Sequence, residues 1–295
     1  MELEKWKEAG KIGSEALAYA KSIVKPGMKL LELAEKVEEF VINKGAKFAF
    51  PINLSIDAVA AHSSPSYNDE ETAHGLLKID VGVSKDGFIS DLACSVDLTE
   101  DKQHGKLIEA SQKALDEAIK LIKPGQELRT IGKKIQETIS SYGFAPIINL
   151  SGHELKQYKL HAGLTIPNHD NGSTTTLREG MIIAIEPFAT SGSGIVQDGR
   201  PSGIYKFEAE HKTRDMLARD VLKYVLEEHR GLPFSGRWIV KKFGVRSLFS
   251  LRALEQANSL HHFKQLVEKT KAPVSQAEAT VLVTSEGCEV LAKLL

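Results

Sequence analysis

The segments ALAYAKSIVKPG, at residues 16–27, and ALDEAIKLIKPG, at residues 114–125, share a spacing of apolar residues and an identical ending. Apolar residues recur every three or four positions in each, which predicts a helix, and the Pro-Gly pair stops that helix. The two segments lie 98 positions apart, a period far longer than that of solenoid repeats. The spacing therefore predicts a duplicated domain and not a repeat array.

The similarity continues after these helices. A second amphipathic run follows each stop, at 30–44 and 128–142, and ends at a glycine suited to a helix C-terminus. The sequence INLS then occurs at 52–55 and again at 148–151. Helix stops alone could match by coincidence, because amphipathic helices resemble one another, but the repeated INLS argues against that. We predict an α/β (α+β) chain whose two helix-helix-strand halves surround a shared antiparallel sheet, with a cleft between the halves.

Apolar, β-prone runs complete the two halves, and each contains one carboxylate. The first run, residues 76–83, contains Asp80, and the second, residues 181–188, contains Glu186. Residues 212–271 differ in character and match nothing in the first half of the chain. We expect a helical insertion there, within a single domain that spans residues 1–295. Its expected helices are at 213–230 and 246–266, separated by a loop at 231–236, and the strands expected after it are 277–285 and a shorter one ending at Leu295.

An Asp86-Gly87 pair between two β-prone runs predicts a hairpin with a two-residue turn. Centred on that turn, the expected pairs are Asp80 with Ala93 and Gly82 with Asp91. Because side chains alternate along a strand, Asp80 and Asp91 should lie diagonally on one face. Two like charges on a mostly apolar face repel, so a bound cation or a raised pKa would make the pair tolerable. The alternative is that this face is solvated.

Three further ligand-type residues, His153, Glu186 and Glu278, occur in apolar or glycine-rich surroundings. One histidine with four carboxylates is an oxygen-rich set suited to two divalent ions, and not to a structural zinc site. Such ions lower the pKa of water and polarise a carbonyl, which is the chemistry of metal-assisted hydrolysis. Taken singly, these residues also have structural explanations: a capping or core histidine, a partner for an arginine, and a surface residue of an edge strand.

Composition limits the class of protein. The 38 Lys and Arg against 39 Asp and Glu give a net charge of −1, so no overall electrostatic attraction to nucleic acid or an anionic membrane is expected. Two cysteines, Cys94 and Cys288, are too few for a disulfide scaffold and fit a reducing compartment. The first residues are not those of a signal peptide, and no run reaches the roughly 18 apolar residues of a membrane span. We expect a soluble, cytoplasmic protein.

Seven motifs follow one another along the chain: Ala60-Ala61-His62, Ile79-Asp80-Val81-Gly82, Asp91, Ser151-Gly152-His153, Lys159-Leu160-His161-Ala162-Gly163, Ala184-Ile185-Glu186-Pro187-Phe188 and Gln276-Ala277-Glu278-Ala279-Thr280. Taken together and in this order, they resemble type II methionine aminopeptidase in its archaeal form, along the whole chain. The resemblance implies the pita-bread fold, an internally duplicated domain, and residues 212–271 resemble the insertion that separates type II from type I enzymes. The family usually reads Phe-Glu-His-Thr in the last motif, so Ala277 and Ala279 put metal affinity and rate in doubt more than the type of reaction.

The resemblance also implies a role for each metal ligand. Asp80 chelates one of two divalent ions, which are Co, Mn, Fe or Zn. Asp91 and Glu278 bridge both ions, while His153 and Glu186 complete the shell of the other. The implied reaction removes the initiator methionine from new polypeptides with a hydroxide bound between the two metals.

The remaining roles concern the substrate. His62 and His161 are implied to hydrogen-bond the substrate amide and the tetrahedral intermediate, and Glu186 to carry the proton taken from the bridging water. Phe50 and Leu160 are implied to wall a pocket for an unbranched thioether side chain, although ordinary core packing explains them equally well. We also expect a preference for small second residues.

Two other functions remain open at this point: a proline-directed peptidase of the same fold, and a non-catalytic relative that contacts ribosomes or RNA. The second has usually lost metal ligands, whereas all five are present here. As partners we expect the N-terminal methionine of nascent or short polypeptides, with association with the ribosome left open. No stable nucleic-acid partner and no membrane partner are expected, and we expect a monomer.

Overall fold

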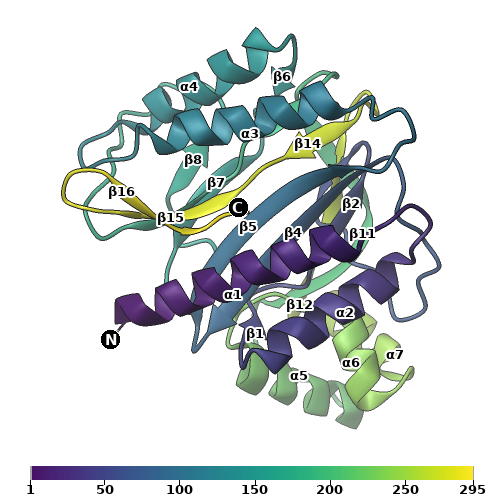
Figure 1. Ribbon diagram of the computed structural model, residues 1–295. Coiled ribbons are helices and arrows are strands. Elements are labelled where there is room, and N and C mark those ends of the chain that lie inside the picture. Colours follow the sequence, from purple (N-terminus) through teal and green to yellow (C-terminus); the bar gives the residue numbers. More distant parts are fainter. Residues whose placement is uncertain (1, 295) are drawn as a thin grey trace.

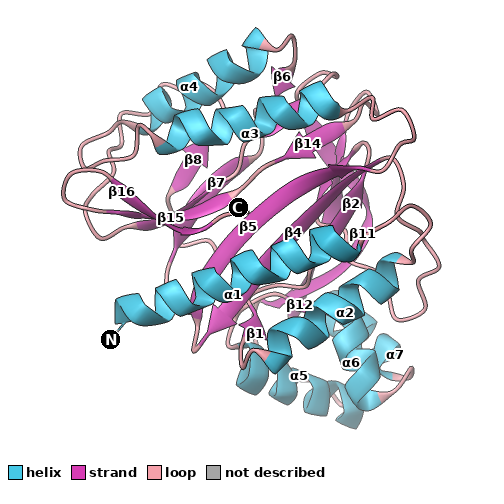
Figure 2. Ribbon diagram, viewed as in Figure 1, coloured by secondary structure: helices cyan, strands magenta, loops and turns pink. Residues whose placement is uncertain are grey.

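The computed structural model describes residues 2–294, which form a mixed α/β fold with two matching helix pairs (Figures 1 and 2). The first pair is α1 (Glu2–Ile23) with α2 (Leu30–Asn43), and the second is α3 (Gly105–Ile119) with α4 (Leu128–Ser141). Figure 1 shows the first pair below the long strands and the second pair above them. The helices predicted on both sides of each Pro-Gly stop are confirmed.

The links between the paired helices repeat in detail. The amide of Gly27 donates to the carbonyl of Ala73 at 2.9 Å, and the amide of Gly125 donates to the carbonyl of Leu177 at the same distance. Both glycines adopt positive φ, at 81° and 80°, a conformation that a glycine adopts without the steric penalty of a side chain. The duplication inferred from the sequence is therefore present in the backbone.

The first half continues in five strands, of which two form the predicted hairpin. Asp86 and Gly87 have φ values of 53° and 86°, as a type I′ turn requires. Asp80 pairs with Ala93 and Gly82 with Asp91, so the predicted register is confirmed. The strands are β1 (Lys47–Phe48), β2 (Asn53–Ile56), β3 (Val59–Ala61), β4 (Leu76–Lys85) and β5 (Phe88–Asp97).

The second half contains shorter strands: β6 (Ala145–Pro146), β7 (Ser151–Leu155), β8 (Thr165–Pro167), β9 (Ile182–Ile185), β10 (Phe188–Thr190), β14 (Val274–Gln276), β15 (Ala279–Val283) and β16 (Cys288–Ala292). Two expected strands are wrong in their bounds. The run 181–188 is broken at Glu186, where Pro187 lacks an amide hydrogen and β9 and β10 join different sheets. The run 277–285 is reduced to β15, with Glu278 in the break after β14. The last strand ends at Ala292, and Leu295 lies outside the described residues.

The two halves meet along a seam between β5 and the segment around Glu278. The amide of Glu278 donates to the carbonyl of Ala93 at 3.1 Å. The hydroxyl of Thr280 accepts from the amide of Asp91 and donates to its carbonyl, both at 2.8 Å. The predicted shared antiparallel sheet thus takes the form of smaller antiparallel sheets, β1-β4-β2 with β5, β14-β10-β6 and β16-β15-β9-β7-β8, joined at this seam.

The region predicted as a helical insertion is only partly helical. It contains α5 (Met216–His229), β12 (Phe234–Ser235), α6 (Gly236–Phe243), α7 (Ser247–Gln256) and β13 (Leu260–Glu268), and it follows the long strand β11 (Val196–Phe207). The helix expected at 246–266 is wrong after Gln256. Asn258 adopts a φ of 56°, which interrupts the helix, and the next residues pair with β11 and β3 in a sheet of order β12-β11-β13-β3.

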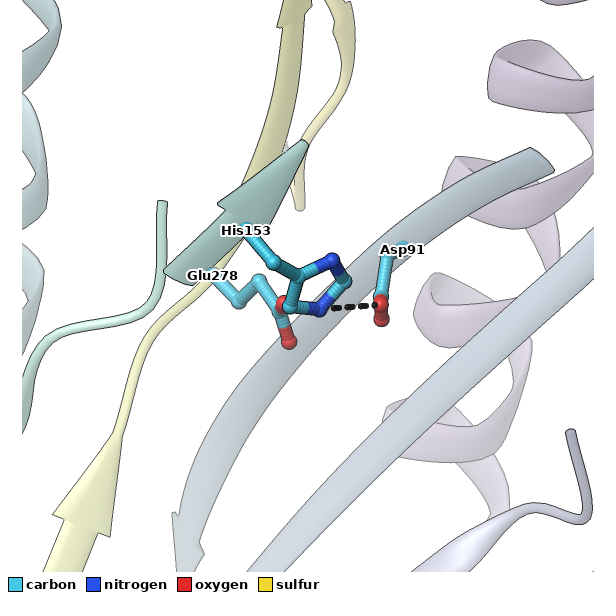
Figure 3. Close-up of side chains that lie close together, drawn as sticks. All are labelled: Asp91, His153 and Glu278. Atoms are coloured by element: carbon cyan, nitrogen blue, oxygen red, sulfur yellow. Dashed lines mark ion pairs between the residues drawn. The ribbon is translucent and has the colours of Figure 1, made fainter. Parts of the chain in front are cut away.

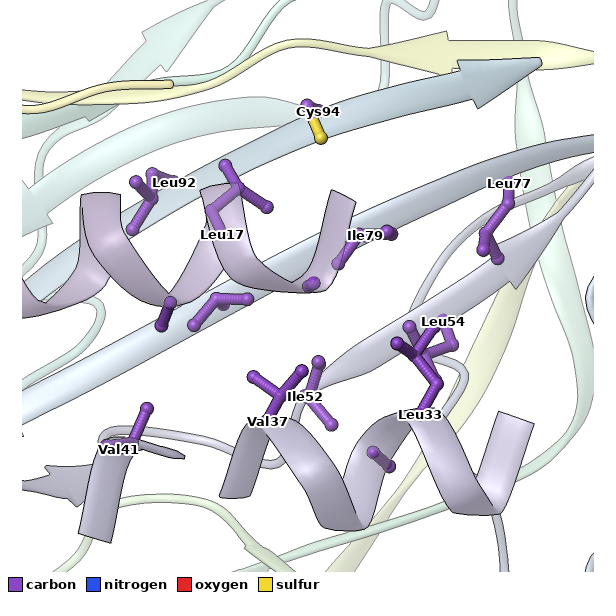
Figure 4. Packing of buried hydrophobic residues seen from close by; sticks show 14 of the residues in the cluster. Leu17, Leu33, Val37, Val41, Ile52, Leu54, Leu77, Ile79, Leu92 and Cys94 are labelled. Carbon is purple, nitrogen blue, oxygen red and sulfur yellow. The ribbon is translucent and has the colours of Figure 1, made fainter. Parts of the chain in front are cut away.

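Each helix pair covers its own half with an apolar core. Figure 4 shows Leu17 of α1 and Leu33 of α2 directed toward Leu54 and Ile79 on the strands, and all four are at most 1% exposed. A second core lies between α3, α4 and the strands β9 and β15. Within residues 2–294, no helix has the length and apolar character that a membrane crossing requires.

Candidate active site

The five predicted metal ligands come from both halves and line one pocket. Asp80 and Asp91 lie on neighbouring strands β4 and β5 of the first half, and the confirmed register places both on one face. The second half supplies His153 from β7, Glu186 from the β9–β10 break and Glu278 from the β14–β15 break. The cavity that they surround has a volume of ≈ 70 Å³.

Three of these side chains converge closely. One ligand atom each from Asp91, His153 and Glu278 can be chosen so that all lie within 4.8 Å of one another. Nε2 of His153 lies 3.4 Å from Oδ2 of Asp91 and 3.7 Å from Oε1 of Glu186. Figure 3 shows the imidazole between the two carboxylates of Asp91 and Glu278. The spacing leaves room for a cation between the groups.

The charges of this cluster are not neutralised by protein groups. Burial raises the pKa of Asp91 to about 8. Burial, and then the neighbouring carboxylates, raise the pKa of Asp80, Glu186 and Glu278 well above the usual range. Within the described chain, no lysine or arginine forms an ion pair with any of the four, and one oxygen each of Asp80 and Asp91 has no hydrogen-bond partner.

These observations test whether the donor set fits divalent metal ions. The free oxygens are hard donors, and burial lowers the pKa of His153 to about 4, so its imidazole is neutral and available as a ligand near neutral pH. Buried carboxylates without cationic partners are costly unless a cation is bound or a proton is retained. The set therefore fits one or more divalent ions.

Two histidines face the same pocket. His62 follows β3 with a φ of 57°, and burial, followed by the nearby His161, lowers its pKa to about 4. The ring of His161 lies 4.4 Å from that of His153, and burial, followed by His153 and Lys206, lowers its pKa to about 4 as well. Both imidazoles are therefore neutral near pH 7.

The predicted apolar walls are also part of the pocket. Phe50, 6% exposed, and Leu160 line it beside the carboxylates. A Cβ at Gly82 would lie 2.1 Å from the Phe50 ring, so the glycine in the Ile79–Val83 run makes room for that ring. Both side chains also belong to an apolar cluster with Ala49, Phe88 and Leu155, as ordinary core packing predicts, and they line the pocket from that cluster.

Several pocket residues were missed from the sequence. Asn53 pairs with Asp80 across β2 and β4, and its Nδ2 donates to the carbonyl of Pro51 at 3.0 Å. Its place in the repeated INLS was the available signal. Phe263, whose ring lies 5.4 Å from that of His62, fell inside a wrongly predicted helix. Gln276, which does not line the pocket itself but donates to Glu278 at 3.3 Å, lies within one of the sequence motifs and had no assigned role. Also missed were Ala61, Ile204 and Pro233.

Comparisons with known proteins agree with this geometry. The model of metallopeptidase family M24 matches residues 4–246. A methionine aminopeptidase of Methanocaldococcus jannaschii is 41% identical over 292 residues, which cover 98% of each chain. A methionine aminopeptidase of Pyrococcus abyssi is 41% identical over 294 residues, which cover 97% of this chain and 98% of that one.

Solved structures share the fold at low identity. A methionine aminopeptidase from Rickettsia prowazekii superposes with a TM-score of 0.70 at 21% identity and covers 98% of this chain and 96% of its own. A thermophilic Arx1 gives a TM-score of 0.86 at 16% identity, covering 98% of this chain and 90% of that one. A prolidase from Pyrococcus furiosus gives 0.64 at 20% identity, covering all of this chain and 64% of that one.

Proposed function

Because the chain belongs to metallopeptidase family M24, we propose that it is a methionine aminopeptidase, a hydrolase that removes the initiator methionine from new polypeptides. One observation carries this proposal: the seven chemistry-bearing residues named from the sequence line a single pocket. Relatives that bear this name and are 41% identical over nearly the whole chain support the same activity. The pita-bread fold is shared with solved methionine aminopeptidases.

Two divalent ions would be held by this donor set. We propose that Asp80 would hold one ion, that His153 and Glu186 would hold the other, and that Asp91 and Glu278 would contribute to both. When bound, such ions lower the pKa of water and polarise the substrate carbonyl. The unpartnered oxygens of Asp80 and Asp91 and the absence of an ion-paired lysine or arginine among residues 2–294 support this assignment. Co, Mn, Fe and Zn all accept these ligands.

The chain's own side chains supply the proton transfers. Glu186, whose pKa is raised by burial, lies at the pocket where it can take a proton from the attacking water and hold it for the leaving amine. His62 and His161 are neutral and can donate an N–H to the substrate carbonyl as negative charge develops on it, or hydrogen-bond the scissile amide. Phe50 and Leu160 would hold the unbranched methionine side chain. The confined pocket favours a small second residue.

Methionine release is the direct test. The protein is incubated with Met-Gly-Met-Met and Co or Mn, and free methionine is measured beside the Asp91→Ala variant. We expect release by the unaltered protein and almost none by the variant. No release with any of Co, Mn, Fe or Zn would refute the proposal.

A comparison of Met-Ala and Ala-Pro peptides separates this activity from that of a proline-directed peptidase, because the fold alone does not distinguish the two. Preferential cleavage of Ala-Pro would identify the second. We further propose that nascent chains in the cytoplasm are the substrate pool and that the enzyme acts as a monomer. Its mass in solution, measured by light scattering, tests the last point.

A further inference from the structure

The ribbon formed by β11 and β13 presents two different faces. Tyr205 and His262 are direct partners across the ribbon, and their rings stack with centroids 4.0 Å apart. Tyr205 packs against the apolar core of the insertion. Because side chains alternate along a strand, the neighbours Ile204 and Phe263 face the opposite way, and both line the active-site pocket.

Lys206 and His261 lie one step further along this pocket face. Lys206 follows Ile204 by two residues, His261 precedes Phe263 by two, and the antiparallel register makes Lys206 and His261 direct partners. The pair therefore lies beside the inner pair Ile204 and Phe263 and extends the wall of the pocket along the ribbon.

A second observation, independent of this register, places His261 near a catalytic histidine. The ring of His261 lies 4.6 Å from that of Phe263, which in turn contacts His62. The rings of His62, Phe263 and His261 therefore lie in a row that extends from the catalytic pocket to the pair Lys206 and His261.

The Lys206 ammonium is free to meet a ligand. Among residues 2–294, neither Lys206 nor His261 takes part in an ion pair or a side-chain hydrogen bond. Asp198, the acidic residue of β11, is opposite Leu266, toward the other end of the ribbon, and Glu208 follows just after β11 ends. The unpaired Lys206 ammonium itself attracts a negatively charged group at this end of the ribbon.

The reach of an extended peptide matches this arrangement. Same-face residues of a strand are about 7 Å apart, and an extended peptide advances about 3.5 Å per residue, so one step along the ribbon spans two substrate residues. With the scissile bond at the catalytic histidines, we propose that Lys206 and His261 form a subsite that prefers an acidic side chain at the third or fourth residue of the substrate. The subsite rests on the peptidase activity proposed above.

The test compares amidated peptides that differ by one charge, Met-Ala-Glu-Ser against Met-Ala-Gln-Ser and Met-Ala-Ser-Glu against Met-Ala-Ser-Gln, with the metal-loaded enzyme. For at least one pair we expect kcat/KM to favour the glutamate by about two- to fivefold, the scale of a partly exposed ion pair. The preference should appear mainly in KM and shrink at high salt.

Two substitutions and a control make the test decisive. Lys206→Met should abolish the glutamate preference. Lys206→Glu should shift it to lysine peptides, which a folding defect cannot produce. Lys223→Met, at a 74% exposed side chain on α5, should keep the preference of the unaltered enzyme. Equal kcat/KM for glutamate and glutamine peptides, or a preference that survives Lys206→Met, would overturn the subsite alone. Failure to cleave any methionine peptide would overturn the proposed function and the subsite with it.

Discussion

Glu268 and Glu278 are both buried, at 0% and 2% exposure. The surroundings of Glu268 stabilise its negative charge, whereas those of Glu278 destabilise it. Glu268, at the end of β13, accepts hydrogen bonds from the amide and hydroxyl of Ser193, from the amide and hydroxyl of Thr270, and from the amide of Ala272. Glu278, in the pocket, accepts one from Gln276 at 3.3 Å and otherwise faces carboxylates.

The difference appears in the pKa of each group. Burial opposes ionisation of Glu268, but the hydrogen bonds from Ser193 and Thr270 outweigh it and lower the pKa to about 2. Burial, and then Asp91 and Glu186, raise the pKa of Glu278 well above its usual range. A buried carboxylate with a full set of hydrogen-bond donors stabilises the fold, whereas a buried carboxylate surrounded by other carboxylates indicates a cation-binding site.

Glu38 is a third buried carboxylate, and it shows how a cation from the protein itself satisfies the charge. Both of its oxygens accept from the guanidinium of Arg237 at 2.7 Å, and one also accepts from the indole of Trp238 at 2.7 Å. This contact joins α2 to α6, which lies in the region 212–271. Substitutions at these three carboxylates should therefore have separable effects.

The largest expected effect separates Glu278 from Glu268. Glu278→Gln should lower kcat/KM for a methionine peptide by about a thousandfold or more, because a lost metal contact removes several kcal/mol of transition-state stabilisation. Glu268→Gln should leave turnover within about twofold. Metal content by mass spectrometry and methionine release measure both. Equal losses of activity in the two variants would contradict the proposed difference between a metal-binding Glu278 and a structural Glu268.

The second prediction concerns the buried ion pair. Arg237→Met leaves Glu38 charged and buried without its partner, so the free energy of unfolding should fall by about 3–5 kcal/mol. Urea denaturation measures the change. Lys36→Met, which removes the exposed Lys36–Glu32 pair on α2, serves as control and should stay within about 0.5 kcal/mol. A loss of similar size in both variants would contradict a structural role for the buried pair.

The third prediction concerns a pocket residue that holds no metal. His161→Ala should reduce turnover by roughly a hundredfold, or about 2.7 kcal/mol, the scale of a lost acid–base or oxyanion contact. Its metal content should match that of the unaltered protein, unlike that of Glu278→Gln. Unchanged turnover would refute the role assigned to His161.

The smallest expected effect is the pH dependence of Glu268. Its pKa is about 2 in the folded state against an ordinary 4.5, so its stabilising contribution is complete above pH 4.5 and is lost as pH falls toward 2. Glu268→Gln should cost about 1–3 kcal/mol at pH 7, because the amide nitrogen cannot accept from Thr270. The gap between variant and parent should narrow below pH 4.5 in denaturation experiments. A constant gap would contradict the lowered pKa.

Local signals accounted for the parts of the fold that could be predicted. The Asp86-Gly87 turn determines which residues oppose one another, so the pairing of Asp80 with Ala93 followed from counting. The Pro-Gly stops likewise marked helix ends. The break at Glu186 was missed although Pro187 was visible, because an apolar run on both sides of the proline resembled one strand.

The region after Gln256 failed for a different reason. Leu260, Phe263 and Leu266 have a spacing that suits a helix, and the burial of β13 does not alternate cleanly. What makes this segment a strand is its pairing with β11, more than fifty residues earlier in the chain, which no local pattern contains. Because of the same error, the sequence did not identify Phe263 as a pocket residue, nor the neighbouring pair Lys206 and His261 on the ribbon.

The seam between β5 and the segment around Glu278 has a thermodynamic consequence. The residues that we propose as metal ligands lie on both sides of it, so ions bound there would favour the state in which the two halves are docked. Ions at a hundredfold excess over their Kd would add about 2.7 kcal/mol to that docking. The amides of Asp91 and Glu278, which are bonded across the seam, would then exchange their hydrogens more slowly as the metal concentration rises.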